Sequence, residues 1–422
     1  MQNIIKRRFF ARCFMDKGKL IISVQSSIGI APVQNAKITL RSTGNPTQIL
    51  ESFVTDNEGR TESVELETPP LEYSMEPEQP QPYSLYTVEV EREGYAPVTI
   101  NGIEVLPQET AIQNIQMRPL ELGDEETNLV IDNNTLFEEY PPKIEETEIK
   151  PTTETGEIVL SRVVVPEIVV VHDGPPSDPL AKDYYVNYSD YIKNVASSEI
   201  YATWPRETIK ANVLAIMSFT LNRVYTEWYR NKSYNFTITS STAYDHKWSR
   251  GRNIFESISN VVDELFGFYL SRPNVKQPIL TQYCDGEMVQ CKNWMTQWGS
   301  KYLGDQGYSA IEILRYYYGS NMYINEAEEI SGIPSSWPGY NLSQGATGQK
   351  VRQLQEQLLR ISRSYPSIPA VSVDGVYGPR TEEAVRRFQK IFYLPQTGVV
   401  DYATWYKISQ IYVGVSRIAE LT

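Results

Sequence analysis

Residues 191–229 read YIKNVASSEIYATWPRETIKANVLAIMSFTLNRVYTEWY, and this stretch decides how the middle of the chain folds. Pro205 suits the first turn of a helix, and Glu207 follows where an acidic side chain favours the helix dipole. The side chains that recur at helical spacing along one face are mostly apolar: Ile209, Val213, Ile216, Met217, Thr220, Leu221, Val224 and Trp228. The pattern predicts one long helix from Pro205 to Tyr229.

The flanks of this helix predict a mixed domain. Apolar runs at residues 163–165 and 168–171 are typical of buried strands, whereas residues 254–270 and 310–318 show helical patterns. We therefore expect a central α+β domain within residues 158–335.

Residues 18–120 predict an all-β sandwich of antiparallel strands. Apolar and polar side chains alternate with period two at residues 36–40 and 86–91. The segment also resembles the carboxypeptidase regulatory-like sandwich, a family that is not catalytic, in the motifs Pro32-Val33, Thr55-Asp56 and Gly94-Tyr95.

Residues 121–157 differ from both neighbours in charge. They hold 12 acidic residues against two lysines, so most of the chain's net charge of −13 lies here, and several prolines interrupt them. An acidic tract with prolines is typical of a solvated linker. We expect a protease to find accessible, extended backbone in it.

Composition argues against several classes of function. A chain of 422 residues with a net charge of −13 lacks the positive charge of a general nucleic-acid binder. No run of about 18 apolar residues predicts a transmembrane helix. The N-terminal extension, residues 1–17, has a basic cluster but no evident signal peptide, because its apolar run is too short. The 29 Tyr and 7 Trp residues fit either sugar stacking or a half-wet core.

Residues 336–422 hold the most specific motifs. Val351, Leu354 and Leu358 share one helix face, as expected for a small core. The unit resembles the three-helix peptidoglycan-binding domain of bacterial cell-wall hydrolases in GATG (345–348), DGVYG (374–378), GVVD (398–401) and Thr404-Trp405. The resemblance implies a small three-helix bundle that binds peptidoglycan.

The segment that ends at Glu199 and enters the long helix through Trp204-Pro205 resembles the stage II sporulation protein D family of lytic transglycosylases. MTQWG (295–299) and EILRYYY (312–318) fit the same family. The resemblance implies that Glu199 is the catalytic general acid and base. It also implies a set of substrate-binding candidates: Asp245, Gln297, Trp298, Tyr316 and Tyr317. The residues alone also allow Glu199 to be an exposed carboxylate that stabilises a helix N-terminus.

Two positions depart from the family pattern. Met217 stands where the family usually has Arg, and CKNW (291–294) replaces a Ser-His-Gly stretch. A wall-binding protein without catalytic activity therefore stays an alternative.

Cys284 and Cys291 allow three interpretations: a disulfide or two buried thiols, a partial zinc site with His246, and a reactive thiol. Some members of the resembled family bind zinc, but Cys-x6-Cys with one His lacks a fourth ligand. We predict no metal and no other cofactor.

The whole arrangement resembles the SleC-type spore cortex-lytic enzymes, which are made as inactive precursors. The resemblance implies a germination-specific zymogen of the spore cortex or coat region, activated by a subtilisin-like serine protease. It would cleave the MurNAc–GlcNAc bond of cortex peptidoglycan to give 1,6-anhydro-muropeptides. We expect the sandwich to cover the cleft near Glu199 and cleavage to fall between about Gln113 and Val159. An N-acetylmuramoyl-L-alanine amidase is the second alternative, although two histidines offer few zinc ligands.

Overall fold

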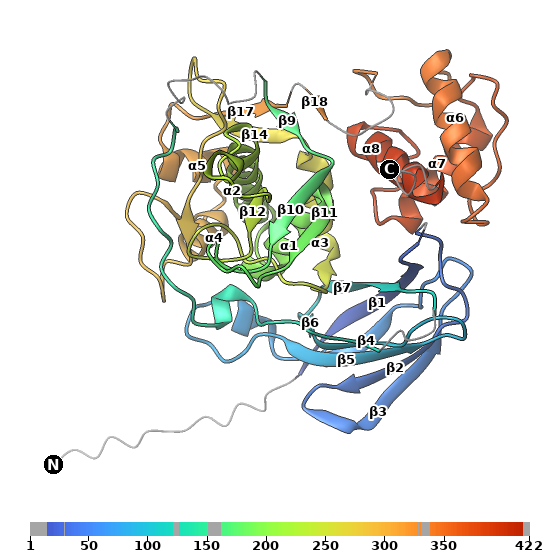
Figure 1. Ribbon diagram of the computed structural model, residues 1–422, viewed down its shortest axis with the longest axis horizontal. Coiled ribbons are helices and arrows are strands. Elements are labelled where there is room, and N and C mark those ends of the chain that lie inside the picture. Colours follow the sequence, from blue (N-terminus) through green and yellow to red (C-terminus); the bar gives the residue numbers. More distant parts are fainter. Residues whose placement is uncertain are drawn as a thin grey trace.

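The computed structural model describes residues 15–28, 30–120, 126–150, 162–327, 329–330 and 338–416. A β region comes first, a mixed α and β region follows, and helices dominate the last part (Figure 1). The β region lies along one side of the middle region, and the C-terminal helices lie beside both (Figure 1). This order agrees with the fold class expected from the sequence.

Two sheets make up the N-terminal β region. Their strand orders are β3-β2-β5-β6-β8 and β13-β7-β1-β4, where β13 comes from the middle region. The N-terminal elements are β1 (Asp16–Ser26), β2 (Lys37–Ser42), β3 (Asn45–Val54), β4 (Val64–Thr68), η1 (Leu71–Ser74), β5 (Ser84–Glu91), β6 (Val98–Val105), β7 (Thr110–Met117) and β8 (Thr127–Val130).

Strand direction differs from the antiparallel prediction at two places. β1 pairs in parallel with β7, with Lys19 opposite Thr110, and β6 pairs in parallel with β8. Alternating apolar side chains indicate which residues face a core, but they do not specify the partner strand or its direction. The pairing of β1 with β7 therefore depends on packing between segments that are far apart in the sequence.

The β region and the middle region share one sheet. β13 (Ile254–Phe255) pairs antiparallel with Ile112 and Ala111 of β7. Next to β13, the buried carboxylate of Glu104 lies 2.7 Å from the Arg252 guanidinium. Apolar side chains of the two regions form one continuous core. The β region is thus docked on the middle region by main-chain, ionic and apolar contacts.

The long helix predicted from Pro205 is the centre of the middle region. α2 (Arg206–Tyr225) is buried along almost its whole length and ends one turn before Tyr229. The other helices around it are η2 (Thr135–Phe137), α1 (Tyr188–Glu199), η3 (Arg230–Lys232), α3 (Glu256–Leu265), α4 (Gln297–Asp305) and α5 (Ala310–Tyr318). The helix expected at residues 254–270 is shorter, because Gly267 has a φ of 93° and the chain continues as a strand.

Short strands complete the middle region. β10 lies between β11 and β12, β14 pairs with β17, β15 with β16, and β9 with β18. These strands are β9 (Val164–Val165), β10 (Ile168–His172), β11 (Asp183–Asn187), β12 (Ile238–Thr239), β14 (Phe268–Ser271), β15 (Tyr283–Cys284), β16 (Met295–Thr296), β17 (Tyr323–Glu326) and β18 (Glu329–Ile330).

The C-terminal part has its own apolar core. It consists of α6 (Gln349–Ser362), α7 (Pro379–Ile391) and α8 (Tyr402–Ser416). Leu354, Phe388 and Trp405, one from each helix, are fully buried in that core. Among the described residues, no helix combines the length and the apolar character needed to cross a membrane.

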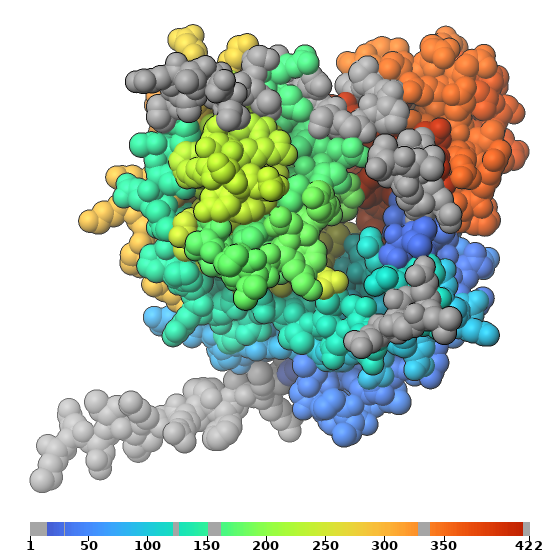
Figure 2. All heavy atoms as spheres, in the orientation of Figure 1, coloured from blue at the N-terminus to red at the C-terminus, as the bar shows by residue number. Residues whose placement is uncertain are grey.

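Part of the acidic tract is packed on the protein, in contrast to the solvated linker predicted for it. Residues 138–150, called the arm below, follow the surface of the middle region, and Figure 2 shows this part of the chain in teal against one side of it. Residues 151–161 lie outside the described part. At the other end of the expected cleavage range, Gln113 is fully buried in β7, so a protease cannot reach that position in the folded protein.

Candidate active site

Glu199 ends helix α1 and is buried, with 3% of its surface exposed. The backbone N–H of Lys247 donates to its Oε1 at 2.7 Å, and the Tyr283 hydroxyl donates to its Oε2. Its place at a helix C-terminus excludes the alternative of an exposed carboxylate at a helix N-terminus. Two donors from distant parts of the chain instead hold the carboxylate in one orientation.

The surroundings of Glu199 favour its protonated form. Burial raises the pKa of Glu199 above its ordinary value, and the Lys143 ammonium, the Tyr283 hydroxyl and the Lys247 amide each oppose part of that rise. A buried carboxylic acid with a raised pKa can hold a proton near neutral pH and give it to a leaving group. The site therefore has the chemistry of a general acid.

Two stacked aromatic rings, those of Tyr283 and His246, lie next to Glu199. The ring of Tyr283 stacks on the imidazole of His246 with ring centroids 5.9 Å apart, and the Tyr191 hydroxyl and His246 Nδ1 share a hydrogen bond of 3.0 Å. Burial, with the positive charges of Lys143 and Arg223, holds the pKa of His246 well below its ordinary value. His246 is therefore a neutral ring that supports Tyr283.

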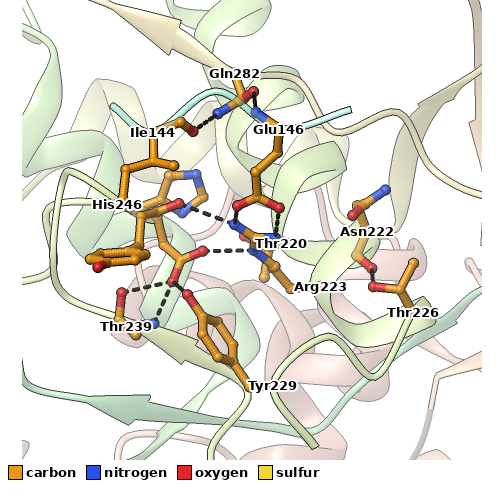
Figure 3. Close-up of polar contacts among 12 residues, drawn as sticks. Ile144, Glu146, Thr220, Asn222, Arg223, Thr226, Tyr229, Thr239, His246 and Gln282 are labelled. Carbon is orange, nitrogen blue, oxygen red and sulfur yellow. Dashed lines mark hydrogen bonds and ion pairs between the residues drawn. The ribbon is translucent and has the colours of Figure 1, made fainter. Parts of the chain in front are cut away.

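Asp245 is fully buried, and both of its carboxylate oxygens accept hydrogen bonds. Its Oδ1 accepts a hydrogen bond from Arg223 Nε at 2.7 Å, while its Oδ2 accepts from the Tyr229 hydroxyl at 2.6 Å and from the N–H and hydroxyl of Thr239 at 2.9 and 2.7 Å (Figure 3). Asp245 precedes His246 and Lys247, which both support Glu199. These contacts favour a positioning role for Asp245 over direct binding of substrate.

The other sequence candidates divide between the site and its surroundings. Gln297 is buried, and its amide donates to the backbone carbonyl of Glu199 at 3.0 Å. Trp298 packs on Trp204 with ring centroids 5.0 Å apart, just beyond the end of α1. Farther away, the Tyr317 hydroxyl lies 3.2 Å from that of Thr296, and Tyr316 is 68% exposed.

Helix α2 carries its buried cation at Arg223 and not at Met217. Met217 is fully buried in α2, whereas Arg223, six residues later, is the buried cation of the same helix. Its guanidinium lies over the Phe219 ring and binds Asp245. It also binds Glu146 (Figure 3).

Cys284 and Cys291 form a disulfide, so neither supplies a thiolate ligand or nucleophile. His246 is buried beside aromatic rings, and the charges that lower its pKa are positive ones. Within the described ranges, no group of three His, Cys, Asp or Glu side chains is arranged to hold a metal ion. The disulfide interpretation thus replaces the two thiol-based alternatives.

Lys143 of the arm reaches into the same site. Its Nζ donates to the backbone carbonyl of Asp245 at 2.6 Å and lies 4.6 Å from the centre of the Tyr283 ring and 5.0 Å from that of Phe219. Burial lowers the pKa of Lys143 to about 8, against the raising effect of Glu199. Neither Lys143 nor Tyr283 has a sequence signal that connects it with Glu199, since only tertiary packing brings Tyr283 to Glu199 and Lys143 to Tyr283.

Two family models match the chain. Residues 180–270 match the model described as Stage II sporulation protein, and residues 347–408 match the one described as Putative peptidoglycan binding domain. A curated relative, the Zinc D-Ala-D-Ala carboxypeptidase of Streptomyces albus G, is 42% identical over 77 residues, which are 18% of this chain and 28% of that protein. The chain thus spans little more than a quarter of the relative's length.

Parts of the chain are also similar to solved structures. The crystal structure of the SleB N-terminal domain is 30% identical over 18% of this chain and 99% of that chain, with a TM-score of 0.16. Klebsiella pneumoniae 5-hydroxyisourate hydrolase is 16% identical over 24% of this chain and 92% of that chain, also with a TM-score of 0.16.

The first family match contains Glu199 and the loop that binds it, and the second covers most of α6–α8. The chain therefore combines a central segment that matches the Stage II sporulation protein model with a C-terminal segment that matches the model of a putative peptidoglycan binding domain.

Proposed function

We propose that the chain is the precursor of a lytic transglycosylase that cleaves the MurNAc–GlcNAc bond of spore cortex peptidoglycan. The observation that carries the proposal is the buried carboxylate of Glu199, which has a raised pKa and is held by two fixed donors, Lys247 and Tyr283. Glu199 and Lys247 lie inside the region that matches the sporulation family. The peptidoglycan-binding domain supports the polymer as the partner.

The proposed reaction needs one carboxyl group that acts twice. Protonated Glu199 gives its proton to the glycosidic oxygen, and the bond between that oxygen and C1 of the muramic residue breaks. The C6 hydroxyl of the same residue then attacks C1, and Glu199 takes the hydroxyl proton. A 1,6-anhydro ring forms, water is not consumed, and Glu199 regains its starting state. A conventional glycosidase requires a second carboxylate to activate water or to act as the nucleophile.

The groups around Glu199 fit these two steps. A carboxyl that gives and then accepts a proton must keep one orientation while its charge changes. The Lys247 amide and the Tyr283 hydroxyl supply that orientation, and the buried His246 and Asp245 support them. Precursor control by proteolysis in the acidic tract, by a subtilisin-like serine protease in the spore, is part of the proposal.

Analysis of the products tests the proposal. Purified cortex is digested with the chain cut between Lys150 and Arg162, and the muropeptides are identified by mass. We expect anhydro-muropeptides, and Glu199→Gln should reduce their formation by about 10²–10⁴-fold. Asp190→Asn, on the exposed first turn of the same helix, is the matched control and should leave activity unchanged.

Other products would overturn the proposal. Free stem peptides without anhydro sugars would indicate the amidase alternative, and an unchanged polymer that still retains the protein would indicate a binding protein. Glu199→Gln with more than about a tenth of the activity would exclude Glu199 as the general acid.

A further inference from the structure

The arm contacts the middle region through side chains that are two or three residues apart. Its inward-facing residues each meet a specific group, whereas the residues between them are exposed. Glu138 binds Lys247, Tyr140 binds Asp285, Lys143 binds the Asp245 carbonyl, Glu146 binds Arg223, and Glu148 binds Arg272. The arm is therefore bound to the middle region by specific side-chain contacts as well as by its covalent connection.

Main-chain contacts fix the arm on both sides of Lys143. The Ile144 N–H donates to the Ala243 carbonyl at 2.7 Å. The side-chain amide of Gln282 then bridges two arm residues, donating to the Ile144 carbonyl at 2.7 Å and accepting from the Glu146 N–H at 2.9 Å (Figure 3). The register of the arm is therefore set within one residue of Lys143.

Two charged anchors hold the segment beyond Lys143. Both carboxylate oxygens of Glu146 bind the guanidinium of Arg223, at 2.7 and 3.0 Å, and both oxygens of Glu148 bind that of Arg272, at 2.6 and 2.7 Å. Paired contacts of this kind fix direction as well as position. Even though burial opposes it, Arg223 lowers the pKa of Glu146 to about 2, which keeps this anchor ionised.

Lys143 lies next to both groups that bind the Glu199 carboxylate. Its ammonium lies over the ring whose hydroxyl binds the Glu199 carboxylate, and it binds the loop whose Lys247 amide does the same. The β region itself contacts this end of the middle region elsewhere, where Ser74 binds Thr203 and Trp204. Asn134, just before the arm, binds the carbonyls of Ser197 and Ile200, and Lys143 of the arm lies over the ring that binds the Glu199 carboxylate.

We infer that the arm is the inhibitory element of the uncut chain, and that Lys143 occupies the place beside Glu199 that a substrate sugar must take. The inference rests on the function proposed above and identifies the segment that inhibits the enzyme before cleavage. The ammonium fills the space over the Tyr283 and Phe219 rings, so a sugar cannot approach Glu199 from that side while the arm is in place. A cut beyond Lys150 frees one end of the arm, so the arm can leave the site while the β region stays docked.

The test uses the full, uncut chain. Lys143→Ala removes most of the side chain, its charge and its hydrogen bond to the Asp245 carbonyl, and so frees the space over the Tyr283 and Phe219 rings. We expect cortex cleavage to rise by about 10²-fold or more over the uncut wild-type chain, as for the recovery of a general acid. Glu148→Lys is a second variant outside the site; it reverses one anchor against Arg272 and should release the arm as well.

Glu145→Lys is the matched control, because it makes the same charge change as Glu148→Lys on an exposed arm residue and should leave the chain inactive. The cut wild-type protein is assayed in parallel. If it is active while both uncut variants are as inactive as the uncut wild type, the inference is wrong and the proposed function stands. If neither the cut protein nor the variants release anhydro-muropeptides, both are overturned.

Discussion

Replacing Tyr283 by Phe removes one hydroxyl that donates to the buried carboxylate of Glu199. A hydrogen bond to the charged form of a carboxyl group stabilises that form, so its loss raises the pKa of Glu199 further. Hydrogen bonds to charged groups contribute about 1.5–3 kcal/mol, which corresponds to roughly one to two pH units. Because the first step needs protonated Glu199, the alkaline limb of the activity profile should move to higher pH by about that amount.

The assay is the pH dependence of kcat/KM for the cut protein on solubilised peptidoglycan. The plateau should fall, because the phenyl ring of the variant has no hydroxyl to orient the carboxylate; this loss is separable from the displacement of the limb. Tyr317→Phe is the control, since its hydroxyl contacts Thr296 and should leave the limb in place. An alkaline limb that stays where it is in Tyr283→Phe, or moves to lower pH, would refute the role of Tyr283 at Glu199.

Two further predictions concern the frame of the site. Asp245→Ala removes one of the two carboxylates that bind the buried Arg223, so the free energy of unfolding should fall by about 3 kcal/mol or more in denaturant titrations. Asp173→Ala at the surface should change little, and equal stability of the two variants would contradict the buried network. After cleavage between Lys150 and Arg162, the two fragments should elute together in size-exclusion chromatography and separate only in denaturant, because β7 and β13 share a sheet and one core. Separation in native buffer would show that only the covalent connection holds the β region on the middle region.

Much of the local structure could be predicted from residue patterns. The apolar spacing behind Pro205 predicted α2 to within one turn, and residues 310–318 form α5 as expected, with Ser309 and Glu312 as a capping box. These elements depend on side chains three or four residues apart, which the sequence displays directly. The family motifs singled out Glu199 and the C-terminal helices on the same local basis.

The sequence could not predict which distant groups surround Glu199. Tyr283 lies 84 residues away along the chain, and it reaches Glu199 only because β15 is packed beside the end of α1. The acidic tract has the sequence pattern of a solvated linker because two lysines cannot balance its 12 acidic residues, and of the described pairs only Lys150 with Glu146 lies within it. Other partners of its acidic side chains, Arg223, Arg272 and Lys247, lie far along the chain.

The sequence by itself therefore determined the order of β, mixed and helical parts, the central helix, and the carboxylate on which the proposed chemistry depends. Only the tertiary structure decided the direction of the β1–β7 pairing, the disulfide of Cys284 with Cys291, and the position of Lys143 beside Glu199. The physical reason is that helices and strands are encoded by neighbours, whereas charge pairing, burial and pKa depend on groups that meet only when the whole chain has packed.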